Sequence, residues 1–223
     1  MGSTPAFTGF LPETLTFYER LGADNNKAWW QAHREEYLDH VREPMELLCG
    51  ELDEFGPFHL FRPYNDMRFA KNRPPYKTHQ GAYGESQGGT GYYVQISAEG
   101  LMCGAGYYSM AKDQLERFRA AVDADATGAE IEEITGRLGR RFRFGAIDEL
   151  KTAPRGYPKD HPRIELLRRK GLIAVKEFGA PAWLTTRRAA TEIRTAWQAA
   201  EPMCAWLDTH VGPSTLPPAD ATG

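Results

Sequence analysis

The sequence predicts an α+β protein, in which an antiparallel sheet built around a central hairpin is covered by N-terminal and C-terminal helices. In both end thirds of the chain, apolar residues recur every three or four positions, as in helices that pack on a core. Between them, residues 91–109 alternate around a glycine-containing turn, which is typical of two paired strands. Helices on both sides of a hairpin favour an antiparallel sheet with a helical cover.

The N-terminal third is predicted to be helical. Pro12 opens a short helix that reaches Leu21, because proline is well accommodated in a first turn. The Asp24-Asn25-Asn26 run supplies capping oxygens for a helix from about Lys27 to Arg42, and Pro44 marks either a kink or the start of another helix. The apolar stripe that we expect to be buried consists of Trp30, Tyr37, Val41, Met45, Leu48, Leu52 and Phe55.

The middle of the chain changes character. From Phe58 to Gly89, proline, glycine, asparagine and aromatic residues are mixed with cations, which predicts a long structured loop with a short strand near Tyr64 to Phe69. The hairpin follows, with strands at 91–97 and 101–109 joined at Ala98-Glu99-Gly100. Gly104 and Gly106 in its second strand indicate that a helix or a ligand approaches the backbone closely.

The C-terminal half continues with helices around 115–122 and 131–138. Strands are predicted at Arg141 to Phe144 and at Leu172 to Phe178, and a long helix at Thr186 to His210. We therefore expect one domain over residues 1–212, followed by a disordered tail over residues 213–223.

Composition excludes several classes of protein. No apolar run is long enough to span a membrane, and the first ten residues lack the pattern of a secretory signal, so we expect a cytoplasmic protein. Cys49, Cys103 and Cys204 are isolated, which predicts small buried side chains and neither disulfides nor a structural zinc site. Cofactor and hydrolase signatures are absent, and His33 and His40 lack a third ligand, so no metal or cofactor is predicted.

The net charge of −3 is unevenly distributed. Residues 62–79 carry a net charge of +4 and residues 151–176 carry +6, so the remaining chain carries −13. Charge that is segregated in this way can focus a positive potential toward an anion. Prolines restrict both segments, so that their Arg and Lys side chains can be held in place for a carboxylate or a phosphate.

These observations lead to the hypothesis that two basic loops form a pocket for a small anionic ligand. Its predicted ligand-binding residues combine cations with tyrosine and histidine: Arg68, Tyr76, Lys77, His79, Tyr92, Lys151, Arg155, Tyr157 and His161. Tyrosine or histidine could act there as a general acid, but no sequence pattern indicates a particular reaction.

Two alternatives remain open. In the first, Asp66 and Asp160 pair with the cations and pin the loops, so that the charge is structural. In the second, the chain is an interaction module that binds nucleic acid or an acidic protein partner. A sequence pI of about 6.1 and the absence of a basic helix weigh against nucleic acid.

Over Phe7 to Val211, the chain also resembles the family known as domain of unknown function 2461. The motifs that carry the resemblance are Asn25-Asn26-Lys27-Ala28-Trp29-Trp30, Phe61-Arg62 with Asp66-Met67-Arg68-Phe69, Pro75-Tyr76-Lys77-Thr78, Gly91-Tyr92-Tyr93, Lys151 with Pro154-Arg155-Gly156-Tyr157, and His161-Pro162 with Leu167-Arg168-Arg169-Lys170-Gly171. The sequence departs from the family pattern at Asn65 and at Arg73-Pro74. The resemblance implies a single cytoplasmic domain and supplies no activity.

Overall fold

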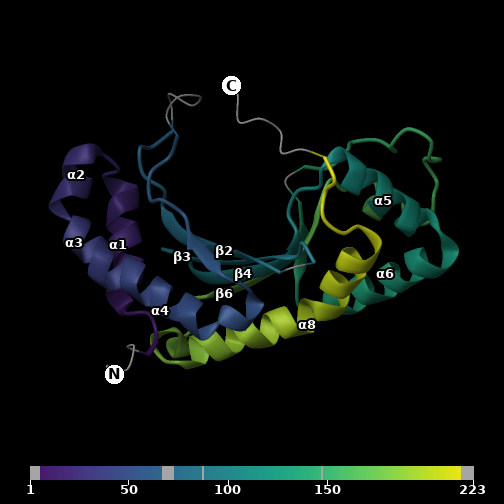
Figure 1. Ribbon diagram of the computed structural model, residues 1–223. Coiled ribbons are helices and arrows are strands. Elements are labelled where there is room, and N and C mark those ends of the chain that lie inside the picture. The colour runs from purple at the N-terminus through teal and green to yellow at the C-terminus, as the bar shows by residue number, and fades with distance from the viewer. Residues whose placement is uncertain (1–5, 67–72, 87, 147, 217–223) are drawn as a thin grey trace. The chain divides into compact units, whose positions relative to one another are not determined.

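The computed structural model describes residues 6–66, 73–86, 88–146 and 148–216 (Figure 1). It confirms the α+β prediction, because helices accompany one antiparallel sheet with the strand order β1-β2-β3-β4-β6-β5. The strands are β1 (Phe58–Leu60), β2 (His79–Glu85), β3 (Gly91–Ser97), β4 (Gly100–Tyr107), β5 (Arg143–Gly145) and β6 (Leu172–Gly179).

The chain divides into two compact units. Unit 1 comprises the described residues of Met1–Glu85, Tyr92–Cys103 and Glu177–Ala196. Unit 2 comprises those of Ser86–Gly91, Gly104–Lys176 and Trp197–Gly223. Strands β3, β4 and β6 and the long helix α8 (Arg188–His210) contribute residues to both units.

The N-terminal helices of unit 1 follow the predicted pattern with one interruption. They are α1 (Pro12–Ala23), α2 (Lys27–Ala32), α3 (Arg34–Tyr37), a π-helical turn (Leu38–Arg42) and α4 (Glu43–Glu51). The predicted helix over 27–42 is broken at His33, whose ring Nδ1 bonds to the Trp29 carbonyl oxygen at 2.7 Å, beside the backbone N–H of the same residue. Pro44 lies in the first turn of α4, which is one of the two predicted alternatives.

The predicted core positions are buried. Of the stripe along the N-terminal helices, Trp30, Tyr37, Val41, Met45, Leu48 and Leu52 are buried, and Phe55 is half-buried. All three cysteines are buried as predicted, and burial raises the pKa of the Cys49 and Cys204 thiols to about 12. At neutral pH these two thiols are protonated and serve as packing groups.

The predicted hairpin is present as β3 and β4. In β3, Tyr92, Val94 and Ile96 are buried, whereas Tyr93 and Gln95 between them are half-buried. The two sets of side chains point to opposite faces of the sheet, because successive side chains in a strand alternate. Helix α4 contacts β1 and β2 on one side of the strands (Figure 1).

The structure corrects the prediction of a long loop over Phe58 to Gly89. Strands β1 and β2 pair antiparallel in this segment, with Phe58 opposite Gly84 and Leu60 opposite Ala82. The pairing extends outward to an isolated bridge between Tyr64 and Tyr76. Strand β2 contains two glycines in seven residues, which weakens the sequence signal of a strand. Half of the predicted strand near Tyr64 to Phe69, residues 67–69, lies outside the described residues, and in the other half only Tyr64 forms a strand-like bridge.

Gly106 in unit 2 is approached by a neighbouring strand as well as by the expected helix, since a Cβ atom there would also lie 3.1 Å from Met203 Cε in α8. Gly106 adopts a φ of +132°, and a Cβ atom there would lie 2.2 Å from the carbonyl oxygen of Leu172 in β6. Only glycine fits this position without displacing the strand.

Unit 2 contains α5 (Lys112–Asp123), α6 (Asp125–Leu138), α7 (Ile164–Leu167) and the C-terminal part of α8. Strand β5 begins at Arg143, two residues later than predicted, and pairs antiparallel with β6, with Phe144 opposite Ala174. In the part of the chain that the structure describes, no helix is both long and apolar enough to cross a membrane.

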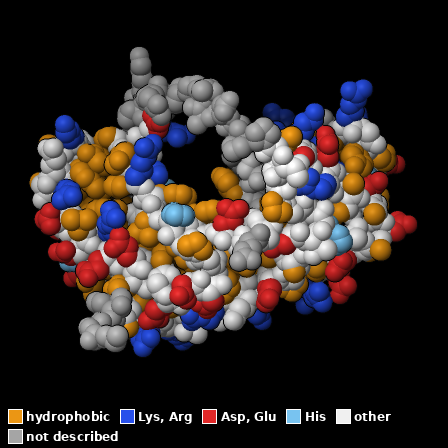
Figure 2. Space-filling model, viewed as in Figure 1, with side chains coloured by type: hydrophobic (Ala, Val, Ile, Leu, Met, Phe, Trp, Pro, Cys, Tyr) orange, Lys and Arg blue, Asp and Glu red, His pale blue; other side chains and the backbone are white. Residues whose placement is uncertain are grey.

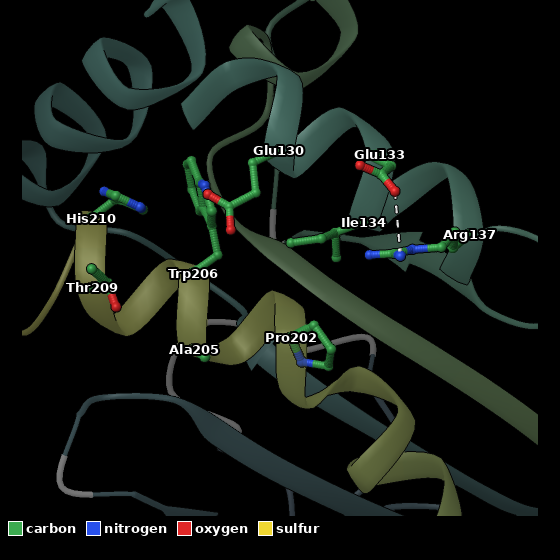
Figure 3. Close-up of a pocket in the computed structure, with 9 residues that line it drawn as sticks. All are labelled: Glu130, Glu133, Ile134, Arg137, Pro202, Ala205, Trp206, Thr209 and His210. Atoms are coloured by element: carbon green, nitrogen blue, oxygen red, sulfur yellow. Dashed lines mark ion pairs between the residues drawn. The ribbon is translucent and has the colours of Figure 1, made fainter. Parts of the chain in front are cut away.

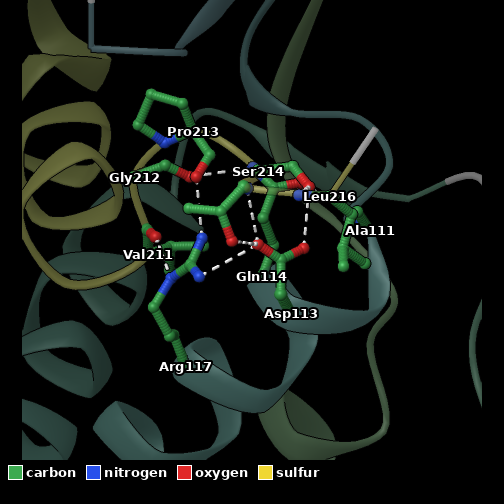
Figure 4. A network of polar contacts seen from close by, with 10 residues as sticks. Ala111, Asp113, Gln114, Arg117, Val211, Gly212, Pro213, Ser214 and Leu216 are labelled. Carbon is green, nitrogen blue, oxygen red and sulfur yellow. Dashed lines mark hydrogen bonds and ion pairs between the residues drawn. The ribbon is translucent and has the colours of Figure 1, made fainter. Parts of the chain in front are cut away.

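The segment after α8 is held against α5 (Figure 4). The Asp113 carboxylate accepts hydrogen bonds from Ser214 Oγ at 2.7 Å and from the Thr215 backbone N–H at 2.8 Å, and Arg117 Nη2 donates to the Pro213 carbonyl oxygen at 2.8 Å. These contacts hold the pKa of Asp113 well below its ordinary value, with the Thr215 N–H as the largest cause. Residues 213–216 of the predicted tail are thus fastened, and residues 217–223 lie outside the described residues.

Trp197 provides a test of the predicted helical core, since its side chain on α8 is only 1% exposed. We expect Trp197→Ala to lower the free energy of unfolding by about 3–5 kcal/mol, because the substitution leaves a cavity. Chemical denaturation measures this change. Gln198→Ala, at the exposed neighbouring position, is the matched control and should stay within about 0.5 kcal/mol of the unmodified protein. Equal stabilities of the two variants would contradict the burial.

Candidate functional site

The open face of unit 1 is the sheet surface that carries His79, Gly81 and Tyr83 of β2 and Tyr93 and Gln95 of β3. Phe61, next to the end of β1, is held beside Gly81, since its backbone N–H donates to the Gly81 carbonyl oxygen at 2.9 Å. A Cβ atom on Gly81 would lie 2.6 Å from Tyr93 Oη and 3.1 Å from Phe61 Cδ2. The glycine thus makes room for two aromatic side chains, which approach each other across it.

Lys77 places a positive charge beside these rings. Its Nζ atom lies 5.2 Å from the centroid of the Phe61 ring, and its side chain is half-buried. Burial and the nearby Arg62 guanidinium lower the pKa of Lys77 below its ordinary value. No described carboxylate forms an ion pair with Lys77. The Lys77 side chain is therefore half-buried, and its ammonium group lies near a second cation, without an ion-pairing carboxylate among the described residues.

His79 follows Lys77 on the same face. Burial and the Lys77 charge lower the pKa of His79 below its ordinary value of 6.5, and the Glu99 carboxylate opposes this shift in part. Glu99 lies in the β3–β4 turn, where the Ser97 hydroxyl donates to its carboxylate at 2.6 Å. The imidazole is therefore largely neutral at neutral pH, and a bound anion would favour its protonation.

Arg62 lies near Lys77, on the segment that follows β1. Its guanidinium carbon lies 5.2 Å from the centroid of the Tyr64 ring, and its Nη2 atom lies 3.9 Å from the Asp66 carboxylate. A pair at this distance, with an Arg62 side chain that is 57% exposed, compensates the charge only weakly. Arg68, the first of the predicted ligand-binding residues, lies outside the described residues.

Tyr76, on the segment that leads into β2, contacts the helices of unit 1. The Asn25 side-chain amide donates to the Tyr76 carbonyl oxygen at 2.9 Å and accepts from the Tyr76 backbone N–H at 3.1 Å. The Tyr76 ring stacks on Trp30, with centroids 4.3 Å apart and an interplanar angle of 9°. Asn26 caps α2 by accepting from the Trp29 N–H at 2.9 Å. The Asn25-Asn26 motif and Tyr76 thus have structural roles.

Tyr92, another predicted ligand-binding residue, lies on the opposite face of β3 from Tyr93. Its side chain is 9% exposed and packs on Phe55, with ring centroids 4.9 Å apart. The structure therefore brings Lys77 and His79 together on the open face, whereas Tyr76 and Tyr92 contribute to the packing of unit 1.

Unit 1 has a second group of aromatic and basic side chains, in which, unlike at Lys77, the cation forms an ion pair with a carboxylate. Trp29 stacks on His33 with centroids 4.0 Å apart, and the Arg20 guanidinium carbon lies 5.6 Å from the Trp29 ring. Figure 2 shows hydrophobic side chains next to Lys and Arg side chains over α1 and α2. Arg20 forms an ion pair with Glu36 at 2.8 Å, so its charge is compensated by the protein itself.

The second basic loop lies in unit 2. Lys151 and Arg155 are exposed, and Tyr157 is half-buried with a raised pKa, chiefly because of burial. His161 Nδ1 accepts from the Arg163 backbone N–H at 3.0 Å, which leaves the proton on Nε2, 3.0 Å from Asp123 Oδ1. Both ring nitrogens of His161 are thus occupied by protein groups.

Other cations of this loop fasten it to the rest of unit 2. Arg163 donates to the carbonyl oxygens of Val122 at 2.7 Å and Asp123 at 2.9 Å, at the C-terminal end of α5. Arg168 donates to the Leu150 carbonyl oxygen at 2.6 Å. Carboxylates from outside the segment pair with its side chains, namely Asp123, Asp148 and Glu149, and Glu165 within the segment pairs with Arg168 at 3.2 Å. The expected pairing of Asp160 with these cations is not found among the described residues, where other carboxylates and backbone carbonyl oxygens hold the loop. A pocket that both loops line stays a prediction.

Unit 2 also contains a groove between α6 and α8, with a volume of about 520 Å³ (Figure 3). Glu130 points toward Trp206 and His210 on the opposite helix, and Glu133 pairs with Arg137 at 3.3 Å. With two glutamates and one arginine, its walls disfavour an anion. Sequence reasoning did not single out this groove. Within the described ranges, no group of three His, Cys, Asp or Glu side chains is placed to hold a metal ion.

Together these features define a helix-covered α+β protein, whose sheet has an open face with aromatic and basic side chains in unit 1. The chain belongs to the family described as conserved hypothetical protein (DUF2461), whose model matches residues 13–206, and this match confirms the resemblance seen in the motifs. No curated protein and no solved structure matches the chain in the corresponding comparisons.

The Asn25 amide can be tested for its structural role. Asn25→Ala removes both hydrogen bonds to the Tyr76 backbone and should lower the free energy of unfolding by about 1–3 kcal/mol. Lys27→Ala, at an exposed position two residues away, is the control and should change stability by less than about 0.5 kcal/mol. Thermal or chemical denaturation of the variants measures both values, and an unaffected Asn25→Ala protein would show that the contact is dispensable.

The titration of His79 tests the electrostatics of the open face. We expect an NMR midpoint below 6.5 that rises in Lys77→Met, because that substitution removes a neighbouring cation. Since the pKa of His79 is lower in the folded protein than in the unfolded chain, unfolding takes up a proton. His79 therefore contributes a loss of stability as the pH falls below about 6.5. A midpoint that does not move in Lys77→Met would contradict the coupling between the two residues.

Proposed function

We propose that this protein binds a small anionic ligand through a carboxylate or phosphate group, at the corner of the open face formed by Lys77, His79 and Arg62. The observation that carries the proposal is the half-buried side chain of Lys77. It packs against the Phe61 ring near Arg62, and no described carboxylate forms an ion pair with it.

The electrostatic reason is that these cations disfavour one another. Arg62 lowers the pKa of Lys77, and Lys77 in turn lowers the pKa of His79. Partial burial increases the cost of such an arrangement, because the charges are screened less by water. An anion between them would relieve the repulsion and would favour protonated His79, so binding should tighten as the pH falls through the pKa of His79.

The side chains around the cations suit an oxyanion. Lysine supplies a compact charge and arginine a planar pair of donors, and both bind carboxylate and phosphate oxygens well. In unit 2, Lys151 and Arg155 of the second loop have exposed side chains that make no hydrogen bond or ion pair with described residues. Their contribution to anion binding stays a prediction, which the Lys151→Met variant tests.

Isothermal titration with inorganic phosphate tests the proposal. We expect saturable binding that weakens about 10-fold to 100-fold in Lys77→Met, since a charge-assisted hydrogen bond is lost while the apolar stem is retained. Lys112→Met, at an exposed position on α5, is the matched control and should bind phosphate as the unmodified protein does.

A second variant, Lys151→Met, tests whether the second basic loop contributes to phosphate binding. Weaker phosphate binding in this variant would support a site that both loops line, and unchanged binding would confine the site to unit 1. Equal affinities of Lys77→Met and the unmodified protein would contradict the proposed site.

A further inference from the structure

The segment between β1 and β2 exposes two aromatic side chains beside Lys77 and Arg62. Phe61 is 41% exposed and Tyr64 is 50% exposed, and Tyr108 in unit 2 is the other large aromatic residue of comparable exposure among the described residues. Exposed aromatic rings leave apolar surface in contact with water. Two of them within four residues, each with a cation 5.2 Å from its ring, form a more specific surface than scattered apolar residues do.

Phe61 is held in place although its ring is exposed. Its backbone N–H donates to the Gly81 carbonyl oxygen at 2.9 Å, and its own carbonyl oxygen accepts from Gln80 Nε2, also at 2.9 Å. Gln80 is buried and accepts a hydrogen bond from the Tyr37 hydroxyl at 2.7 Å. The exposed ring is thus attached to a backbone segment that the core of unit 1 fixes, so little ordering would accompany stacking on it.

The side-chain amide of Gln95, near Phe61, can donate a hydrogen bond to the edge of a ring that stacks on Phe61. Tyr93 lies beside Phe61, with ring centroids 6.1 Å apart and planes inclined by 33°, and its hydroxyl donates to Gln95 Oε1 at 2.7 Å. This contact orients the Gln95 amide and leaves its NH₂ group without a hydrogen bond to the described residues. The open face thus presents an aromatic ring, an amide donor and basic side chains side by side.

We propose that the anion bound here carries a planar heteroaromatic ring and is a nucleoside phosphate, an inference that rests on the proposed anion site. The base would stack on Phe61 while its phosphate contacts Lys77 and Arg62. Aromatic side chains on an open sheet face, combined with cations, are a common means of binding unpaired bases. Outside the two basic segments the chain carries a net charge of −13, which favours a mononucleotide over a long polyanion.

Parallel titrations with inorganic phosphate and with adenosine monophosphate test the inference. We expect the mononucleotide to bind at least 10-fold more tightly than phosphate. Phe61→Leu should bring the ratio of the two affinities close to one, whereas Phe61→Trp should retain it. The ratio is the readout because Phe61 also packs against Lys77, so that its loss can alter phosphate binding as well. Tyr108→Leu, which alters an exposed aromatic residue of unit 2, is the matched control and should keep both affinities.

The outcomes separate the two proposals. Equal affinities for phosphate and mononucleotide would overturn the aromatic inference and leave the anion site intact, whereas the absence of binding by both ligands would overturn the anion site itself. A six-nucleotide single strand forms the third arm. If it binds at least 10-fold more tightly than the mononucleotide, with an affinity that falls steeply with salt, the site recognises nucleic acid and the mononucleotide assignment is wrong.

Discussion

The arrangement of unit 1 depends on the contact between the Asn25 amide and the backbone of Tyr76, together with the stacking of Tyr76 on Trp30. These contacts join two segments that are 51 residues apart and fix the arm that leads into β2. Lys77 and His79 follow directly on that arm, so their positions on the open face depend on it. A half-buried cation needs such support, because it would otherwise turn into solvent and lower its electrostatic free energy.

In unit 1, side chains alternate between the two faces of β2 and β3, so that one face packs into the core and the other carries the proposed site. One face of β2 and β3 carries Gln80, Ala82, Tyr92, Val94 and Ile96, all of which are buried. The other face carries polar and aromatic side chains that remain partly accessible, and Gly81 allows Phe61 and Tyr93 to approach each other there. Because adjacent residues serve different faces, Tyr92 and Tyr93 have different surroundings although they are neighbours in sequence.

The sequence predicted the elements with a strong period, namely the N-terminal helices, the hairpin and α8, since burial imposes that period directly. It missed β2, whose glycines conceal the strand. Charge segregation led to Lys77 and His79, but it could not distinguish them from His161 and Arg163, whose partners include backbone carbonyls and α5 residues about 40 positions away. Phe61, Tyr93 and Gln95 were missed as site residues, although the alternation already placed Tyr93 opposite Tyr92.

If a bound anion compensates the cations of the open face, the pKa of His79 responds to that anion directly. NMR titration of the His79 imidazole should give a midpoint below 6.5 in the free protein and a higher midpoint in saturating phosphate. Lys77→Met should show little further rise on addition of phosphate. A midpoint that phosphate leaves unchanged in the unmodified protein would contradict the account, because no anion would then lie within range of these charges.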